Sequence, residues 1–109
     1  MDFPQELKDF HIHFVGIKGT GMAALVEICH NRGAIITGSD VPDSFYTDKI
    51  LQKLGIVPYT NFCSSNISKD VQLVVYSSAY KLESNPELIE AQKLNIPIIT
   101  YGNNSGISK

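Results

Sequence analysis

The sequence predicts an α/β fold: a doubly wound, mainly parallel sheet of about five strands with helices on both faces. Three observations lead to this prediction. Short β-branched or aromatic runs alternate along the chain with segments of helical apolar spacing. The run at 71–76 is almost continuously apolar, which is typical of a strand buried on both faces. The first run ends at a glycine-rich segment, 16–21, which opens a helix.

Length and composition are those of one globular domain. The chain has 109 residues, 43% of them hydrophobic and 18% charged, which excludes a disordered tail. A net charge of −2 without a basic patch argues against nucleic acid as a partner. No apolar run has membrane-spanning length and the N-terminus lacks a secretory signal, so we expect no membrane partner and a cytoplasmic location. Two cysteines, Cys29 and Cys63, are too few for a disulfide framework and are expected to be reduced.

The first half of the expected fold is a strand, a helix and a second strand. Residues 11–16 are rich in β-branched and aromatic side chains and end at a glycine, as a strand would. Apolar residues at 22, 25, 26 and 29 then recur at the spacing of one helix face. Gly33 suits the left-handed position that ends a helix, and the second strand follows at 34–38.

The second half continues the alternation. The expected elements are a helix at 47–54, a short strand at 56–59, the buried strand at 71–76, a helix from Asn85 to about Asn95, and a last strand at 96–100. Pro58 places the short strand at a sheet edge, because proline has no N–H to donate. Asn85-Pro86-Glu87 combines a capping residue, a first-turn proline and an acid at the positive end of the helix dipole.

The glycine-rich segment nearly fits two phosphate-binding patterns. The dinucleotide fingerprint requires glycine at its third position, where this chain has Lys18. The phosphate loop of ATPases requires Lys and then Ser or Thr, where this chain has Met22 and Ala23. We therefore exclude an ATP site on this chain and expect a diphosphate held by backbone N–H groups at the helix start. The alternative is a glycine-rich turn that only packs the helix on the sheet.

A crevice at the carboxyl ends of the strands is the expected place of the ligand. In doubly wound sheets this crevice lies where the strand order reverses, here between the loop after residue 15 and the loop after residue 76. Asp40 ends the second strand, where Rossmann domains place an acid that binds ribose, and Ser39 lies beside it. The alternative for both residues is to cap the following turn.

Five segments of this sequence occur together, and in this order, in one family of enzymes. They are the stretch from His13 to Met22, Gly38-Ser39-Asp40, Tyr76-Ser77-Ser78-Ala79, Asn85-Pro86-Glu87 and Ile96-Pro97-Ile98. Over about residues 11–101 the chain resembles the N-terminal domain of the Mur ligases, and among them the branch that joins L-alanine to UDP-N-acetylmuramic acid. The resemblance implies a Rossmann-like domain that binds the UDP part of this substrate for peptidoglycan precursor synthesis.

The resemblance also implies a set of site residues. The glycine loop would lie against the pyrophosphate. Ser39-Asp40 and Ser77-Ser78-Ala79 would line the nucleotide crevice. The implied substrate contacts are Gly16, Ile17, Lys18, Gly19, Thr20, Gly21, Met22, Ser39, Asp40, Ser77, Ser78 and Ala79. The family usually has glycine where Lys18 stands, so this lysine either adds charge beside the pyrophosphate or points to solvent.

Complete enzymes of this family use ATP, with magnesium, to convert the muramic acid carboxylate into an acyl phosphate, which the amine of L-alanine then attacks. That chemistry requires a central ATPase domain and a third domain. We therefore expect residues 1–109 to be the UDP-sugar-binding domain of a longer ligase, without catalytic or metal-ligating residues or a cofactor of its own, and inactive alone. The tail at 102–109 fits a linker or a cut helix.

Other interpretations stay open at this point. A ligase that recycles a murein tripeptide onto the same nucleotide sugar has a very similar N-terminal domain. A NAD(P)-binding domain of an oxidoreductase or of a nucleotide sensor fits the strand–helix–strand order and Asp40, although Lys18 argues against it. A scaffold module with an empty crevice is the third alternative.

Several further residues have a plain structural interpretation. His11 and His13 share one face of a strand and are expected at a sheet edge, because no third metal ligand is near in sequence. Cys29 is expected in the core, and Cys63 lies in a loop with nothing nearby to activate it. The group Glu83, Glu87 and Glu90 is expected to form a solvated helix face.

Overall fold

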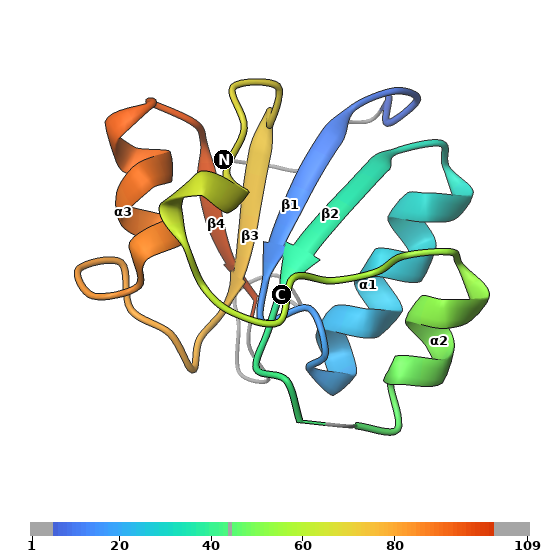
Figure 1. Ribbon diagram of the computed structural model, residues 1–109. Helices are drawn as coiled ribbons and strands as arrows, with labels where there is room; N and C mark the ends of the chain where they lie inside the picture. The colour runs from blue at the N-terminus through green and yellow to red at the C-terminus, as the bar shows by residue number, and fades with distance from the viewer. Residues whose placement is uncertain (1–5, 44, 102–109) are drawn as a thin grey trace.

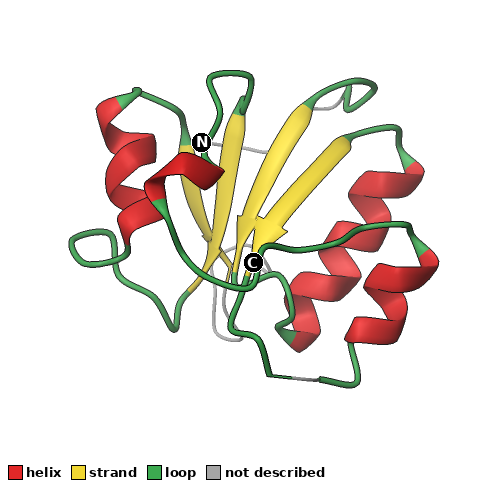
Figure 2. Ribbon diagram, viewed as in Figure 1, coloured by secondary structure: helices red, strands yellow, loops and turns green. Residues whose placement is uncertain are grey.

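Parallel strands form the centre of the computed structural model, with helices packed on both sides of them (Figure 1). The structure describes residues 6–43 and 45–101. Its elements are β1 (His11–Val15), α1 (Thr20–Asn31), β2 (Ile35–Ser39), α2 (Asp48–Lys53), a 3-10 turn η1 (Ser64–Asn66), β3 (Leu73–Ser77), α3 (Pro86–Lys93) and β4 (Ile98–Tyr101). Figure 2 shows their alternation along the chain. The tail at 102–109, expected to be a linker or a cut helix, lies outside the described residues.

The sheet has the order β2-β1-β3-β4, and each neighbouring pair is parallel. The chain starts in the middle with β1, moves outward to β2, and then crosses back to β3 and β4. The strand order therefore reverses between β1 and β3, which confirms the doubly wound parallel arrangement.

The expected number of strands is too high by one. The segment at 56–59 contributes only an isolated bridge between Tyr59 and Ser39 within the described part of the chain. Tyr59 donates its N–H to the carbonyl of Gly38, and its own carbonyl accepts the N–H of Asp40. Because Tyr59 directs both its N–H and its carbonyl to β2, the nitrogen of Pro58 faces away from β2, as is usual for a proline in an edge segment.

The two faces of the sheet bury different side chains. Ile12 of β1 packs in one cluster with Val26 of α1 and Leu51 of α2. Val74 of β3 packs in a second cluster with Leu88 of α3. Because successive strand residues point to opposite faces, α1 and α2 cover one side and α3 covers the other, as Figure 1 shows.

The expected helix ends are present. Gly33 and Gly55 have φ values of 93° and 77°, in the left-handed region that ends a helix. The Asn85 side chain accepts the N–H groups of Glu87 and Leu88 and so caps α3. None of the helices in the described ranges combines the length and the apolar run needed to cross a membrane.

Candidate functional site

The loop after β1 and the loop after β3 meet where the strand order reverses. Gly16 has a φ of 85°, and a Cβ on it would lie 2.8 Å from the ring of Tyr80 and 2.9 Å from Cβ of Ser77. Only glycine satisfies both this backbone conformation and this close approach. The two loops that the sequence places at the crevice therefore lie side by side.

The end of β2 holds the first part of the glycine loop. The N–H groups of Gly16 and Ile17 donate to the carbonyl of Ser39, over 2.8 and 3.2 Å. The N–H of Lys18 donates to Oδ2 of Asp40 over 2.8 Å. These three amides therefore serve the fold and are not directed at a ligand.

The start of α1 is the part of the loop that is suited to an anion. Gly19 is the N-cap residue, so no side chain caps this helix. The first N–H groups of a helix lack partners inside it and lie at the positive end of its dipole. Together they form the kind of site at which a phosphate binds.

Two apolar side chains of the loop face inward. Ile17 and Met22 are 0% and 2% exposed and belong to the core under α1. A Cβ on Gly21 would lie 2.7 Å from the ring of Tyr101, whereas one on Gly19 would meet nothing closer than 3.5 Å. At Ile17, Gly19, Gly21 and Met22, contacts to a ligand would therefore come from the backbone.

Lys18 is built into the fold by each of its polar groups. Besides its N–H, its carbonyl accepts the hydroxyl of Thr47 over 2.6 Å. Its ammonium donates to the carbonyl of Asp43 over 2.7 Å and lies 3.5 Å from Oδ1 of Asp48. The side chain is 7% exposed and stands 5.6 Å from the ring centre of Phe45. It therefore does not point to solvent.

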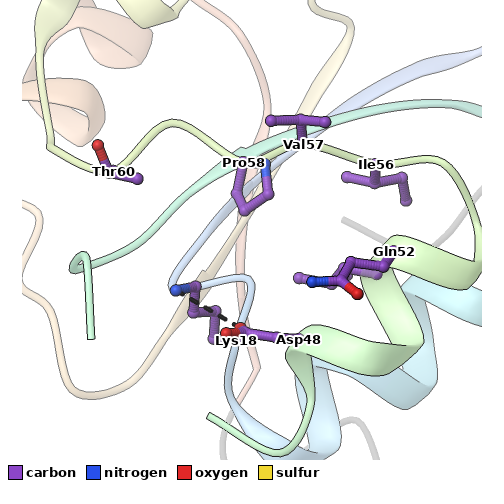
Figure 3. A pocket seen from close by; sticks show the side chains of 8 residues that line it. Lys18, Asp48, Gln52, Ile56, Val57, Pro58 and Thr60 are labelled. Carbon is purple, nitrogen blue, oxygen red and sulfur yellow. Dashed lines mark ion pairs between the residues drawn. The ribbon is translucent and has the colours of Figure 1, made fainter. Parts of the chain in front are cut away.

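Lys18 and Asp48 form the polar end of a pocket of about 280 Å³ between α2 and the segment at 56–60 (Figure 3). The lining residues are Lys18, Asp48, Leu51, Gln52, Ile56, Val57, Pro58 and Thr60. Half of these lining residues are aliphatic, and Lys18 and Asp48 are the two charged ones among them.

Asp40 connects three loops at the crevice. Its Oδ1 accepts the N–H of Val41 over 2.7 Å, as a residue that caps its own turn would. The hydroxyl of Tyr80 donates to the same oxygen over 3.4 Å. Burial and the charge of Asp40 raise the pKa of Tyr80, so its hydroxyl stays a neutral donor. Asp40 is 4% exposed, which makes it a buried link between the loops after β1, β2 and β3.

The segment Ser77, Ser78 and Ala79 follows β3 and begins beside Gly16 of the glycine loop. The hydroxyl of Ser77 accepts the N–H of Ala79 over 3.2 Å, while Ser78 and Ala79 are exposed. A second pocket, of about 300 Å³, opens here and is lined by Tyr76, Ser78, Tyr80, Lys81, Leu82, Glu83 and Thr100.

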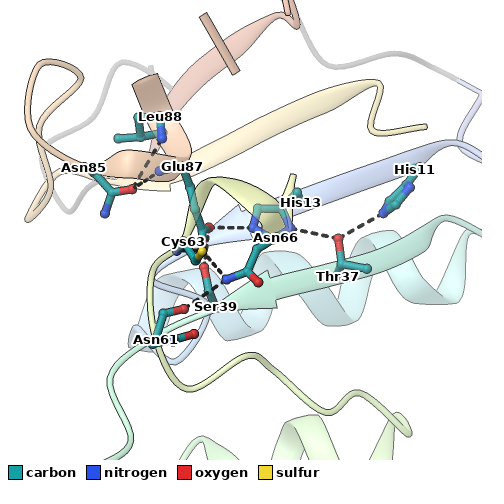
Figure 4. Close-up of polar contacts among 10 residues, drawn as sticks. All are labelled: His11, His13, Thr37, Ser39, Asn61, Cys63, Asn66, Asn85, Glu87 and Leu88. Atoms are coloured by element: carbon teal, nitrogen blue, oxygen red, sulfur yellow. Dashed lines mark hydrogen bonds and ion pairs between the residues drawn. The ribbon is translucent and has the colours of Figure 1, made fainter. Parts of the chain in front are cut away.

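Glu87 corrects one expectation from the sequence. It is 0% exposed and lies under α3 against the sheet, and not on a solvated helix face. Its Oε1 accepts Nε2 of His13 over 2.7 Å and the hydroxyl of Ser39, and its Oε2 accepts Nδ2 of Asn66 over 2.7 Å and the N–H of Cys63 over 3.2 Å (Figure 4). Glu87 lies in the first turn of α3, where the helix dipole favours a negative charge, and its carboxylate also accepts four buried or partly buried hydrogen bonds.

The histidines belong to the same network. His11 and His13 do share one strand face, since Nε2 of one and Nδ1 of the other both lie 2.9 Å from Oγ1 of Thr37. The expectation of a sheet edge is wrong, because β1 is an interior strand and His13 is fully buried. Within the described residues, no three His, Cys, Asp or Glu side chains are grouped as a metal site requires.

The two thiols have different surroundings, and neither is in a disulfide. Burial in the core raises the pKa of Cys29 to about 11, although Arg32 acts in the opposite direction. The hydroxyl of Ser65, 3.2 Å from the sulfur, lowers the pKa of Cys63. The expectation that nothing acts on Cys63 is therefore wrong.

Residues 11–104 match the model of the Mur ligase family, catalytic domain. A relative from Treponema pallidum (strain Nichols), named UDP-N-acetylmuramate–L-alanine ligase, is 47% identical over 98 residues, which cover 90% of this chain and 20% of the relative. A protein of the same name from Desulfitobacterium hafniense (strain Y51) is 51% identical over 92 residues, which cover 84% of this chain and 20% of the relative. The chain thus spans about a fifth of the length of these relatives.

Two solved structures share the fold. One is UDP-N-acetylmuramate-alanine ligase MurC from Thermotoga maritima, with a TM-score of 0.73 and 32% identity, matched over 83% of this chain and 20% of that one. The other is UDP-N-acetylmuramate:L-alanyl-gamma-D-glutamyl-meso-diaminopimelate ligase from Neisseria meningitides, with a TM-score of 0.74 and 26% identity, matched over 86% and 28%.

Proposed function

The chain belongs to the Mur ligase family, and from this premise we propose that it binds the UDP part of UDP-N-acetylmuramic acid. In this proposal residues 1–109 are the N-terminal domain of a longer cytoplasmic ligase that joins L-alanine to this nucleotide sugar in peptidoglycan precursor synthesis. The names of the relatives and the share of their length that is matched support the proposal.

The uncapped start of α1 is the observation that carries the proposal. The N-cap residue Gly19 is exposed and has no side chain that could accept the first N–H groups of the helix. Asp40 and Ser39 hold the preceding loop rigid from the β2 side. A diphosphate would accept the N–H groups at this helix start, with Ser78 and Ala79 on the opposite wall of the crevice.

The twelve residues implied by the resemblance divide by role in this proposal. The backbone from Gly19 to Met22 and the segment from Ser77 to Ala79 would contact the ligand. Gly16, Ile17, Lys18, Ser39 and Asp40 would act through the frame that they build around the helix start. The chain would bind and orient the nucleotide and leave the ligation to the rest of the longer protein.

ATP and magnesium would act elsewhere in the longer protein. Met22 and Ala23 occupy the positions where an ATPase phosphate loop has its lysine and hydroxyl, and they are 2% and 0% exposed in the core. The residues of this loop therefore do not fit a γ-phosphate and its magnesium ion.

A titration of the chain with UDP-N-acetylmuramic acid, followed by amide NMR, tests the proposal. We expect shifts at residues 19–22 and 77–79, with NAD and NADP as parallel controls that cause none. A response to a nicotinamide dinucleotide alone would overturn the proposal in favour of an oxidoreductase or sensor domain. Silence with all three compounds would mean that this chain does not bind UDP by itself.

A ligase that attaches a tripeptide to the same nucleotide sugar is the second candidate, because the Neisseria structure has a TM-score of 0.74. The identities of 47% and 51% to proteins named as L-alanine ligases favour the first candidate. Both candidates assign the same nucleotide ligand to this chain, so full-length activity with L-alanine or with the tripeptide distinguishes them.

A further inference from the structure

Ser39 connects the buried carboxylate of Glu87 to the glycine loop. Its hydroxyl donates to Oε1 of Glu87, and its carbonyl accepts the N–H groups of Gly16 and Ile17. The hydroxyl turns about χ1 and the carbonyl about ψ, but both groups are attached to the same Cα. A hydrogen bond that holds the side chain therefore limits the movement of this Cα, and with it the position of the carbonyl that holds the loop.

The same carboxylate also holds the segment that pairs with the end of β2. Its Oε2 accepts the side chain of Asn66 and the N–H of Cys63 (Figure 4). A few residues earlier, Tyr59 pairs through its backbone with Gly38 and Asp40. The corner at 38–40 is thus fixed by one buried carboxylate, both directly and through the neighbouring segment.

Packing energy alone does not explain a charged group at this place. A buried ion pair usually adds little stability over apolar residues of similar volume, because desolvation offsets its Coulomb energy. The carboxylate of Glu87 accepts four donors from three separate parts of the chain. What such a group supplies is a unique geometry, since each donor has one partner in one direction.

We propose that Glu87 is a positioning residue for the nucleotide site. It touches no ligand. Its carboxylate sets the Ser39–Asp40 corner, and this corner sets the three amides from Gly16 to Lys18 and thereby the start of α1. The ligand is the diphosphate of a UDP-sugar, and its identity rests on the proposed function. The effect of Glu87 on the position of the glycine loop does not depend on that function.

Hydrogen exchange in the ligand-free chain tests the geometry. Glu87→Gln keeps the size of the side chain but turns one acceptor atom into a donor, so two of the four donors lose their partner. Ala91→Gly is the matched control, because Ala91 is buried one turn further along α3 and its loss destabilises the helix without touching the network. We expect Glu87→Gln to speed exchange at the amides of 16–18 about tenfold relative to those of β1 and β3. Ala91→Gly should affect all of these amides alike.

Titration with UDP under conditions where each variant is folded tests the consequence. We expect Glu87→Gln to bind UDP about tenfold more weakly than the parent chain, and Ala91→Gly to stay within about twofold of it. If Glu87→Gln does not fold, Ser39→Ala replaces it in the experiment. This variant removes only the hydrogen bond from the Ser39 hydroxyl to Glu87, and we expect it to bind UDP about tenfold more weakly as well.

Two results would overturn the proposal. One is exchange at 16–18 that changes only in step with the sheet, and the other is equal UDP affinity in Glu87→Gln and Ala91→Gly. If the parent chain does not bind UDP, the proposed function fails for this chain. The exchange comparison then decides by itself whether Glu87 positions the loop.

Discussion

The backbone N–H of Lys18 donates to Oδ2 of Asp40 over 2.8 Å and joins the glycine loop to the end of β2. The two residues are 22 positions apart in the sequence. Because Oδ1 of the same carboxylate accepts Val41 and Tyr80, one buried side chain connects three loops of the crevice. The acid at the position where Rossmann domains bind ribose is therefore a part of the frame of the glycine loop.

Replacement of Asp40 by alanine should lower the free energy of unfolding by about 1–2 kcal/mol, because the N–H of Lys18 loses a hydrogen bond to a charged group. UDP binding should weaken as well, because the loop before the helix start is then held less firmly. Calorimetric titration and urea unfolding measure the two effects, with Asp40→Asn as a milder variant that keeps one acceptor oxygen. Unchanged affinity would limit Asp40 to a role in the stability of the fold.

The glycines at 19 and 21 should respond differently to substitution. Gly19→Val should lower thermal stability only modestly, because a Cβ there would make ordinary contacts of 3.5 Å or more, but should weaken UDP binding at least about tenfold by blocking the helix start. Gly21→Val should lower stability too, because its Cβ would meet the ring of Tyr101. Melting curves and titrations of both variants check this. Full affinity in Gly19→Val would exclude the helix start as the phosphate site.

Lys18→Met should lower the free energy of unfolding by about 1–2 kcal/mol, because the ammonium bonds to Asp43 and faces Asp48 inside the fold. UDP affinity should stay within about twofold of the parent, since this charge is already paired. Lys49→Met, at an exposed position of α2, is the control. A large loss of affinity in a folded Lys18→Met chain would show that the ammonium does act on the diphosphate.

Stability should fall in acid partly through Glu87. Burial alone would raise the pKa of this carboxyl, but hydrogen bonds from His13, Ser39 and Asn66 outweigh it and hold the pKa below its ordinary 4.5. Between the lowered pKa of the folded state and 4.5, the unfolded chain binds more protons than the folded chain. The contribution of ionised Glu87 to the free energy of unfolding is therefore complete above this pH window and is lost as the pH falls through it. Urea midpoints measured from about pH 6 to pH 3 should therefore fall more steeply for the parent than for Glu87→Gln. Parallel profiles would contradict this.

One thiol should react quickly with a disulfide reagent in the native chain. Cys63 has a lowered pKa and is partly exposed, whereas Cys29 is buried with a pKa of about 11. Cys63→Ser should remove the fast phase, and unfolding should restore the reactivity of Cys29. Equal rates for both thiols in the native state would show that the core opens around α1.

Local signals in the sequence predict most of the fold correctly. Gly33 and Asn85 mark the ends of helices by their own conformational or capping preferences, which do not depend on distant residues. The one error in the sheet concerns the edge segment at 56–59, which makes a single bridge to β2 in the described part of the chain. The number of residues that pair depends on how the neighbouring strand runs beside the segment, and the sequence of the segment alone does not contain this information.

The sequence by itself determined the order of strands and helices, the place of the glycine loop between the first strand and its helix, and membership in the family. Those properties depend on neighbours in the chain and on motif spacing. Only the tertiary structure decided that Glu87 is buried, that Lys18 is paired internally, and that Ser39 faces a carboxylate from α3. The donors to Glu87 lie 21 to 74 positions away. A polar side chain is buried only where folding brings it such partners, and no local pattern encodes that meeting.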